Sequence, residues 1–157
     1  MKIYLVGFMG CGKSSMGKKL ASVYRFPFVD TDALFEKEYQ CTIPDFFVSH
    51  TEEEFRIKEQ KILYQTAQFD DAVIATGGGM PCFEDNMEWL LSHGTVVYVE
   101  MSPLALHHRL IHSKKERPLL SNKETLLEDI ETLLAQRETT YKKAHISISG
   151  IRKKVEH

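Results

Sequence analysis

A pattern able to bind phosphate lies near the amino-terminus, where Gly7–Ser14 (GFMGCGKS) fits G-x-x-x-x-G-K-[ST]. In such a loop, backbone N–H groups hold a triphosphate, and glycines let the backbone come close because they carry no side chain. Lys13 supplies a positive charge for the β- and γ-phosphates, and Ser14 supplies a hydroxyl for Mg²⁺. A strand-like stretch precedes the loop and a helical pattern follows it, which favours this interpretation over a glycine-rich turn without a ligand.

Two carboxylates, Asp30 and Asp32, follow the second strand-like segment at alternate positions. This spacing suits two roles, with one carboxylate facing Mg²⁺ near Ser14 and the other facing the hydroxyl of an acceptor. The alternative is that the pair only caps the next helix. The neighbouring phosphate loop favours the catalytic interpretation.

Other candidate groups each have a structural alternative. The triplet Gly77–Gly79 is either a plain turn or a place where backbone N–H groups meet a ligand closely. Arg56 follows three acidic residues, so it could simply pair with them on a solvated helix face. The aromatic residues Phe46, Phe47 and Phe55 are more typical of a core, although a small ring-shaped substrate would need apolar walls.

Histidine and cysteine give weaker signals. His108 and His112 lie four residues apart on a predicted helix, which is a spacing of two metal ligands, but the sequence suggests no third ligand. We therefore expect no metal site there. The three cysteines form no C-x-x-C motif, which is typical of reduced thiols rather than of a disulfide framework.

Five strand-like segments must position these groups, with helical patterns between them. They are Lys2–Val6, Pro27–Val29, Ala72–Ala75, Thr95–Glu100 and His145–Ser149. Alternation of this kind predicts a parallel sheet covered by helices on both faces. Ligands in such folds bind beyond the carboxyl ends of the strands, where the phosphate loop, the aspartates and the glycine triplet all fall.

Capping patterns mark the expected helix boundaries. Thr51–Glu54 fits a capping box that opens a helix to about Phe69, and Ser121–Glu124 fits another that opens a helix to about Lys143.

Two further helices are predicted beside the expected ligand. Ser102 and Pro103 predict the N-cap and first residue of a helix that continues to about Ile111. After the phosphate loop, apolar residues at helical spacing predict the buried face of the first helix. These residues are Met16, Leu20, Val23 and Tyr24.

Composition points to a small-molecule partner. The chain has 157 residues, which matches one domain, and it is 43% hydrophobic and 27% charged, as globular domains usually are. Its formal charge of −2 gives no field of one sign for nucleic acid or a membrane surface. No secretory signal pattern opens the chain and no apolar run reaches membrane-spanning length. We therefore expect a cytoplasmic monomer.

In this order, the motifs resemble the shikimate kinase family over nearly the whole chain. The resemblance implies a three-layer α/β/α P-loop kinase with a five-stranded parallel sheet of order 2-3-1-4-5. It also implies a single domain, 1–157, with a substrate-binding insertion at about 33–61 and a mobile lid at about 111–124. The matching text is Gly7–Ser14, Asp30–Asp32, Phe55-Arg56 with Glu59, Thr76–Gly79, Arg117–Leu120, and Arg137 with Tyr141.

The resemblance further implies transfer of the ATP γ-phosphoryl group to the 3-hydroxyl of shikimate, a step toward chorismate and the aromatic amino acids. The catalytic residues would be Lys13, Asp32 and Arg117. ATP would be bound by Gly10, Cys11, Gly12, Lys13, Ser14, Ser15, Arg109 and Arg117. Shikimate would be bound by Asp32, Phe47, Phe55, Arg56, Gly77, Gly78, Gly79 and Arg137. Mg²⁺ would be held by Ser14 and, through water, by Asp30.

The chain departs from the family pattern at two places. Cys11 stands where many members carry serine, and we expect activity to survive because this position acts through its backbone. Family members commonly continue into another helix beyond the last strand, so residues after Gly150 that approach the adenine are expected to be reduced. The alternatives are another small-metabolite P-loop kinase, acting on gluconate or a nucleotide, and a nucleotide-binding module without catalytic activity.

Overall fold

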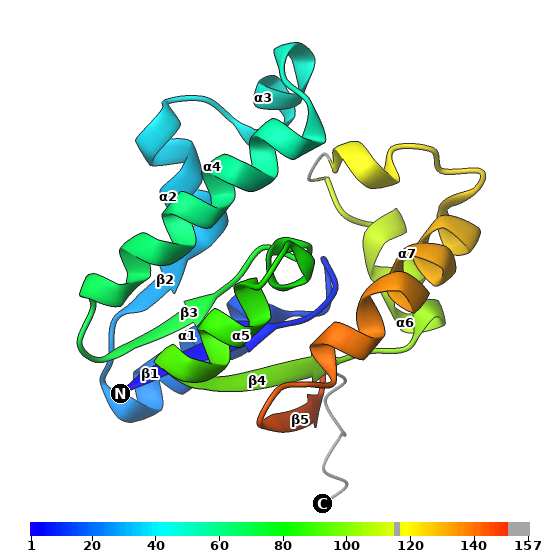
Figure 1. Ribbon diagram of the computed structural model, residues 1–157. Helices are drawn as coiled ribbons and strands as arrows, with labels where there is room; N and C mark the ends of the chain where they lie inside the picture. The colour runs from blue at the N-terminus through cyan, green and yellow to red at the C-terminus, as the bar shows by residue number, and fades with distance from the viewer. Residues whose placement is uncertain (115–116, 151–157) are drawn as a thin grey trace, which may run out of the picture.

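A parallel sheet of five strands forms the centre of the computed structural model, which describes residues 1–114 and 117–150 (Figure 1). The strand order is β2-β3-β1-β4-β5 and every pairing is parallel, which confirms the expected fold class. Two strands begin one residue later than the sequence predicts, and Asp30 is the last residue of β2. The strands are β1 (Lys2–Val6), β2 (Phe28–Asp30), β3 (Ala72–Ala75), β4 (Thr95–Glu100) and β5 (Ile146–Ser149).

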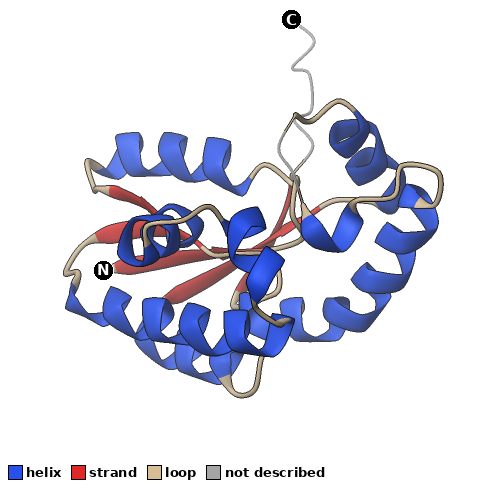
Figure 2. Cartoon of the chain, turned by 90° about the horizontal axis from the view of Figure 1, so that it is seen from above, coloured by secondary structure: helices blue, strands red, loops and turns tan. Residues whose placement is uncertain are grey.

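Helices cover both faces of this sheet, as the view from above shows (Figure 2). They are α1 (Lys13–Tyr24), α2 (Thr31–Tyr39), α3 (Ile43–Ser49), α4 (Glu52–Gln65), α5 (Asn86–His93), α6 (Pro103–Ile111) and α7 (Leu126–Tyr141). Short 3-10 turns occupy Thr66–Gln68, Met80–Cys82 and Pro118–Leu120. In the part of the chain that the structure describes, no helix is long and apolar enough to cross a membrane.

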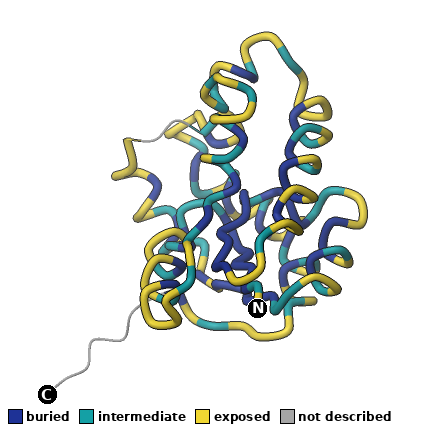
Figure 3. The backbone as a smooth tube through the Cα atoms, turned by 90° about the vertical axis from the view of Figure 1, so that its left-hand side faces the viewer, coloured by how far each residue is buried: buried dark blue, intermediate teal, exposed yellow. Residues whose placement is uncertain are grey.

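The main core surrounds the central strands, which are the most deeply buried part of the molecule (Figure 3). Strand β3 is buried at all four positions, and β1 is buried from its second residue onward. Such continuous apolar strands are typical of a parallel sheet, because helices exclude water from both faces.

A second, smaller apolar cluster lies within α2, α3 and α4, the elements that follow β2. It consists of Phe35, Phe46, Phe55 and Ile62, with Phe47 packed against it. The aromatic rings meet at angles typical of edge contacts, for example 86° between Phe35 and Phe46. In Figure 1 these helices stand to one side of the sheet, and α6 and α7 lie on the other side.

The two predicted capping boxes have different outcomes. At Thr51 both hydrogen bonds of the box are present, and α4 ends at Gln65 before a 3-10 turn carries the chain to Gln68. The second prediction is wrong, because α7 begins at Leu126 and its N-cap is Thr125. Ser121 instead ends the turn Pro118–Leu120.

Another correction concerns the buried face of α1. Val23 and Tyr24 are exposed, at 77% and 48%, whereas Gly17 and Ala21 are buried. Met16 and Leu20 do pack against the core, as expected. The sheet therefore receives a face of α1 with small residues, and the large side chains at its end remain outside. The expected helix Pro103–Ile111 is present, and the Ser102 side chain caps it.

Candidate active site

The phosphate loop connects β1 to α1 and is shaped by glycines. Gly10 and Gly12 have φ angles of 82° and 91°, in the left-handed region that favours glycine. A Cβ on Gly12 would also lie only 2.9 Å from Nη1 of Arg109. Lys13 is buried, and its ammonium group donates hydrogen bonds to the carbonyl oxygens of Gly7 and Phe8, the second at 3.2 Å. The backbone carbonyls of the loop thus hold the Lys13 ammonium group in place.

Asp30 uses its two carboxylate oxygens for different contacts. Oδ1 accepts a hydrogen bond from the backbone N–H of Asp32 at 2.9 Å, which caps α2. Oδ2 accepts from the hydroxyl of Ser14 at 3.3 Å. The capping alternative is therefore realised, and at the same time one oxygen remains directed at the phosphate loop.

Asp32 lies in the first turn of α2, beside the glycine triplet. A Cβ on Gly77 would come within 2.9 Å of Oδ1 of Asp32 and 2.7 Å of Oε2 of Glu59, so the site tolerates only glycine here without a shift. The N–H of Gly77 donates to the hydroxyl of Thr31 at 3.0 Å, which ties the triplet to the start of α2. The predicted aspartate pair and glycine triplet are therefore brought together.

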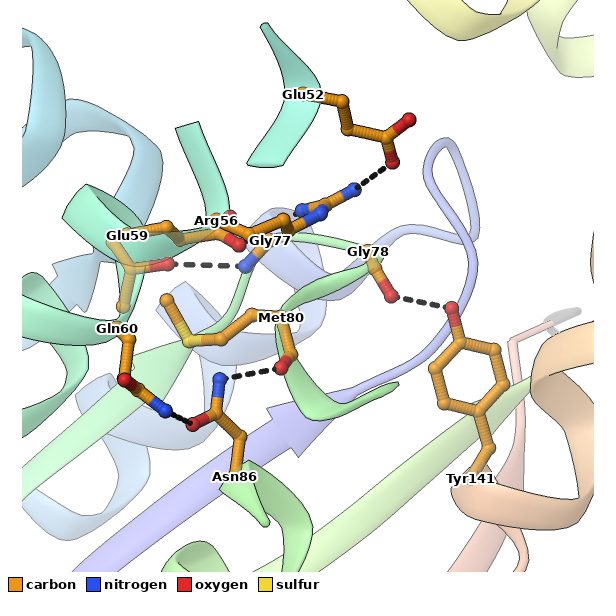
Figure 4. Close-up of polar contacts among 10 residues, drawn as sticks. Glu52, Arg56, Glu59, Gln60, Gly77, Gly78, Met80, Asn86 and Tyr141 are labelled. Atoms are coloured by element: carbon orange, nitrogen blue, oxygen red, sulfur yellow. Dashed lines mark hydrogen bonds and ion pairs between the residues drawn. The ribbon is translucent and has the colours of Figure 1, made fainter. Parts of the chain in front are cut away.

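Arg56 projects from α4 between two acidic side chains (Figure 4). Its Nη1 donates to Glu59 at 2.8 Å, and its Nη2 lies 3.6 Å from the more exposed Glu52. The guanidinium carbon also lies 5.2 Å from the centre of the Phe55 ring. Arg56 does pair with a helix neighbour as the alternative proposed, but the pair faces the candidate site.

Glu59 is a buried carboxyl group in an unusual electrostatic position. Burial raises the pKa of Glu59 to about 7, Arg56 opposes that rise, and the nearby Asp32 carboxylate adds to it. The site thus contains an acid that ionises near neutral pH, while its partner guanidinium stays charged.

Arg137 projects from α7 behind the glycine triplet. It is buried, and its Nη1 has no hydrogen-bond partner within residues 1–114 and 117–150. A Cβ on Gly79 would collide with Arg56 and lie 2.9 Å from Nη2 of Arg137, so only a glycine lets both guanidinium groups approach this backbone. An unpaired buried donor beside a second guanidinium is a site prepared for an anion.

These elements surround one cavity of about 640 Å³. Two predicted site residues do not line it: Cys11 is buried in the core, and Arg137 lies just behind Gly78 and Gly79. The predicted residues that line it are Gly10, Gly12, Lys13, Ser14, Ser15, Asp30, Asp32, Phe47, Phe55, Arg56, Gly77, Gly78, Gly79, Arg109 and Arg117. The structure therefore brings nearly the whole predicted set to a single space.

The segment after α6 contributes one side of the cavity through Arg117, Pro118 and Leu119. Arg117 donates to the hydroxyl of Ser113 at 3.0 Å. Burial lowers the pKa of Arg117 and the Asp32 carboxylate opposes this shift, so the guanidinium faces the acidic side of the site.

Some residues of the site had no role in the sequence interpretation. Glu59 was part of the matching pattern, and its position three residues after Arg56 on one helix is a signal for an ion pair. Glu36 lines the cavity and accepts a hydrogen bond from the N–H of Ile43 at 2.8 Å, across the connection between α2 and α3. No sequence spacing predicts the hydrogen bond between Ile43 and Glu36, because it depends on the path of the connection between α2 and α3.

No metal cluster of three or more His, Cys, Asp or Glu side chains occurs among the described residues. The rings of His108 and His112 are 5.0 Å apart and form an edge contact at the end of α6. The expectation about residues after Gly150 concerns 151–157, which lie outside the described residues.

Three features together define a P-loop kinase. They are a phosphate loop between β1 and α1, acidic residues at the end of β2 and a sheet of order 2-3-1-4-5. Within that class, residues 9–157 match the profile of the shikimate kinase family. The chain belongs to the shikimate kinase family, whose members use ATP.

Individual relatives agree with this assignment. A shikimate kinase from Phocaeicola vulgatus is 40% identical over 145 residues, which cover 91% of this chain and 83% of the relative. The crystal structure of a shikimate kinase from Bacteroides thetaiotaomicron superimposes with a TM-score of 0.90 at 35% identity, covering 96% of this chain and 86% of that one. A shikimate kinase from Acinetobacter baumannii, solved in complex with shikimate, gives a TM-score of 0.91 at 34% identity, covering 97% and 84%.

Proposed function

We propose that this protein transfers the γ-phosphoryl group of ATP to the 3-hydroxyl of shikimate, with Mg²⁺, in the pathway toward chorismate. One observation carries the proposal: a single cavity joins the phosphate loop to Asp32 and Arg56, and directly behind it lies Arg137, whose Nη1 has no hydrogen-bond partner among the described residues. Phosphoryl transfer requires a nucleotide and an acceptor held in line, and this arrangement supplies both ends of that line.

The nucleotide would lie along the loop and the start of α1. Lys13 would contact the β- and γ-phosphates once they replace the loop carbonyls as its partners. Arg109, which lies 3.5 Å from the carbonyl of Gly10, would lie against the adenine. The backbone of Gly10, Cys11 and Gly12, with Ser15, would complete the phosphate contacts.

The residues near the loop fit a magnesium ion. Ser14 and Asp30 offer hard oxygen donors 3.3 Å apart, and Mg²⁺ usually takes one or two protein oxygens together with phosphates and waters. Ser14 would contact the ion directly and Asp30 through water. When bound, the ion neutralises charge on the phosphates.

Asp32 would bind the acceptor hydroxyl and help to remove its proton. Its nearness to Gly77 and to Arg117 supports this role, because the carboxylate would lie between the bound acceptor and the lid. A carboxylate that accepts the hydroxyl proton also orients the attacking oxygen, which is the main requirement of this reaction.

The opposite side of the cavity would hold shikimate, a small anionic polyol. Arg56 and Arg137 would bind its carboxylate, since forked guanidinium groups match a carboxylate better than an ammonium group does. The backbone of Gly77, Gly78 and Gly79 would contact the substrate, and Phe47 and Phe55 would form its apolar wall.

We also infer that the single domain contains a substrate-binding insertion and a mobile lid. Residues of about 33–61 would form the substrate-binding insertion, which the cluster around Phe35 and Phe46 supports because it packs apart from the main core. Residues of about 111–124 would form the lid, with Arg117 neutralising charge on the transferring group.

The test of this function is ADP formation with ATP, Mg²⁺ and shikimate, compared with gluconate and nucleoside monophosphates as acceptors. Shikimate alone of these acceptors should stimulate ADP release, and removing Mg²⁺ should abolish it. Equal stimulation by gluconate would favour another metabolite kinase. Tight ATP binding without turnover on any acceptor would favour a binding module.

A further inference from the structure

Tyr141 is a buried side chain that the proposed mechanism does not use. It lies at the end of α7, one helical turn after Arg137, and its ring packs 5.2 Å from that of Tyr98. Its hydroxyl donates a hydrogen bond to the carbonyl oxygen of Gly78, as Figure 4 shows, and the hydroxyl also lies within electrostatic reach of the Arg137 guanidinium. One oxygen atom therefore interacts with both a guanidinium and a backbone carbonyl of the candidate site.

The hydrogen bond from Tyr141 to the Gly78 carbonyl also fixes the direction of the next backbone N–H group. A trans peptide is planar, and its C=O and N–H groups point in opposite directions. When Tyr141 holds the carbonyl of Gly78, the N–H of Gly79 is directed away from Tyr141, and Gly79 lines the cavity. Because this segment has no side chains of its own, its peptide planes would otherwise rotate easily.

Tyr141 also lies near a second donor group of the candidate site, the Arg137 guanidinium. The Arg137 guanidinium interacts electrostatically with the Tyr141 hydroxyl, and its Nη1 has no hydrogen-bond partner among the described residues. Burial raises the pKa of Tyr141, so the phenol remains protonated and donates to Gly78 throughout the working range of pH. The same hydroxyl thus donates to the carbonyl and keeps a neutral oxygen beside the guanidinium.

We propose that Tyr141 is a positioning residue of the acceptor site, which aligns the Gly79 N–H and the Arg137 guanidinium toward the substrate carboxylate. This inference rests on the proposed function, because the carboxylate is that of shikimate. Tyr141 itself stays behind the site, since it is fully buried and does not line the cavity. Its effect is on acceptor binding and leaves the nucleotide side unchanged.

The test is Tyr141→Phe, which removes the hydroxyl and keeps the ring. KM for shikimate should rise roughly three- to tenfold, the loss expected for one hydrogen-bonding group, while kcat and KM for ATP change less than twofold. The methyl ester of shikimate is the discriminating substrate, because its uncharged group gains little from the aligned donors. Wild type and variant should therefore differ less than twofold with the ester.

Tyr98→Phe is the matched control, because it removes a hydroxyl from the other ring of the same pair without touching Gly78. It should leave KM for shikimate unchanged. A Tyr141→Phe variant with unchanged KM, or with equal losses for acid and ester, would overturn the inference. Should that variant not fold, 4-fluorophenylalanine at position 141 replaces it, because fluorine fills the place of the hydroxyl and cannot donate to Gly78. A selective KM shift for the acid would support the inference, and no shift would refute it.

The same measurements test the role of Tyr141 separately from the proposed function on which it rests. A wild-type protein that neither binds nor phosphorylates shikimate would overturn the proposed function and the role of Tyr141 together. A wild-type protein that is active, with Tyr141→Phe indistinguishable from it, would overturn only the role of Tyr141.

Discussion

Asp30 and Asp32 are two residues apart, yet their surroundings differ, which predicts different duties. Asp30 is held by Ser14 and by the start of α2, whereas Asp32 stands beside Gly77 and near Arg117. We expect Asp32→Asn to lower turnover by roughly 10²-fold with little change in ATP affinity, because a general base is lost. Asp30→Asn should mainly raise the Mg²⁺ concentration needed for half-maximal activity.

Steady-state kinetics over a Mg²⁺ titration, with ATP binding measured separately, distinguish the two aspartates. Each variant is the control for the other, since both remove one negative charge from the same turn. Superimposable Mg²⁺ titrations for the two variants would show that the duties are not divided.

Glu59 makes stability depend on pH in a predictable direction. The folded protein keeps its carboxyl protonated until about pH 7, whereas the reference value for an unperturbed glutamate is 4.5. The folded state therefore binds more protons between these values, and stability falls as pH rises through them. Glu59→Gln cannot titrate, so the variant should lose less stability than wild type from pH 4.5 to 7.

Urea unfolding at several pH values measures the difference in unfolding free energy between wild type and Glu59→Gln. The titrations of all other groups cancel in this difference. The gap in unfolding free energy should change in favour of the variant as pH rises and should level off above about pH 8. A gap that moves toward wild type would mean that pairing with Arg56 outweighs burial of Glu59.

At the scale of elements, helix starts offer a paired test because the chain contains the same capping pattern twice. Thr51→Ala should cost about 1 kcal/mol of unfolding free energy, since it removes a side-chain cap of α4. Ser121→Ala should change stability by much less, because Ser121 does not begin a helix. Urea unfolding of both variants measures the two costs, and equal losses would contradict the assigned start of α7.

The proposed lid, at residues of about 111–124, gives a second test at this scale. Arg117 reaches the cavity from a short turn, so its charge would favour the transition state more than bound ATP. We expect Arg117→Ala to lower kcat by at least about 10²-fold, with a smaller change in ATP Kd. Amide exchange at residues 111–114 and 117–124 should slow when shikimate binds with a non-hydrolysable ATP analogue. Normal turnover in the variant, with unchanged exchange, would identify a static loop.

At the scale of the whole molecule, the cavity draws its walls from both halves of the chain, so a bound ligand should stabilise the entire fold. Shikimate at about 100 times its Kd should add about 2.7 kcal/mol to the unfolding free energy. Urea unfolding with and without shikimate measures this, and gluconate at the same concentration serves as the control. An equal gain from gluconate would indicate binding that does not depend on the acceptor.

Much of this architecture is accessible from sequence because local rules and global fold agree. Apolar runs with a glycine-rich loop after the first predict parallel strands, and the rule about carboxyl ends gathers Asp32 and Gly78 at one edge. The order of the strands came from the family resemblance, since pairing partners are chosen by tertiary packing that propensity does not encode.

The remaining features depend on where the chain runs in space. Thr51 and Ser121 carry the same pattern, but only the first stands where a helix actually begins. Val23 continues the helical spacing of Met16 and Leu20, yet it is 77% exposed, because the buried side of α1 is formed by Gly17 and Ala21. The contacts of Glu36 with Ile43 and of Tyr141 with Gly78 join separate segments, and no local spacing predicts them.

The central place of β1 has a consequence for synthesis on the ribosome. This first strand pairs with β3 on one side and with β4 on the other, and those strands begin at Ala72 and Thr95. The nascent chain must therefore carry this apolar strand with both hydrogen-bonding edges open until β3 has emerged, and with one edge open until β4 has emerged. Open apolar edges are templates for aggregation, so translation passes through a vulnerable interval that closes only when β4 docks.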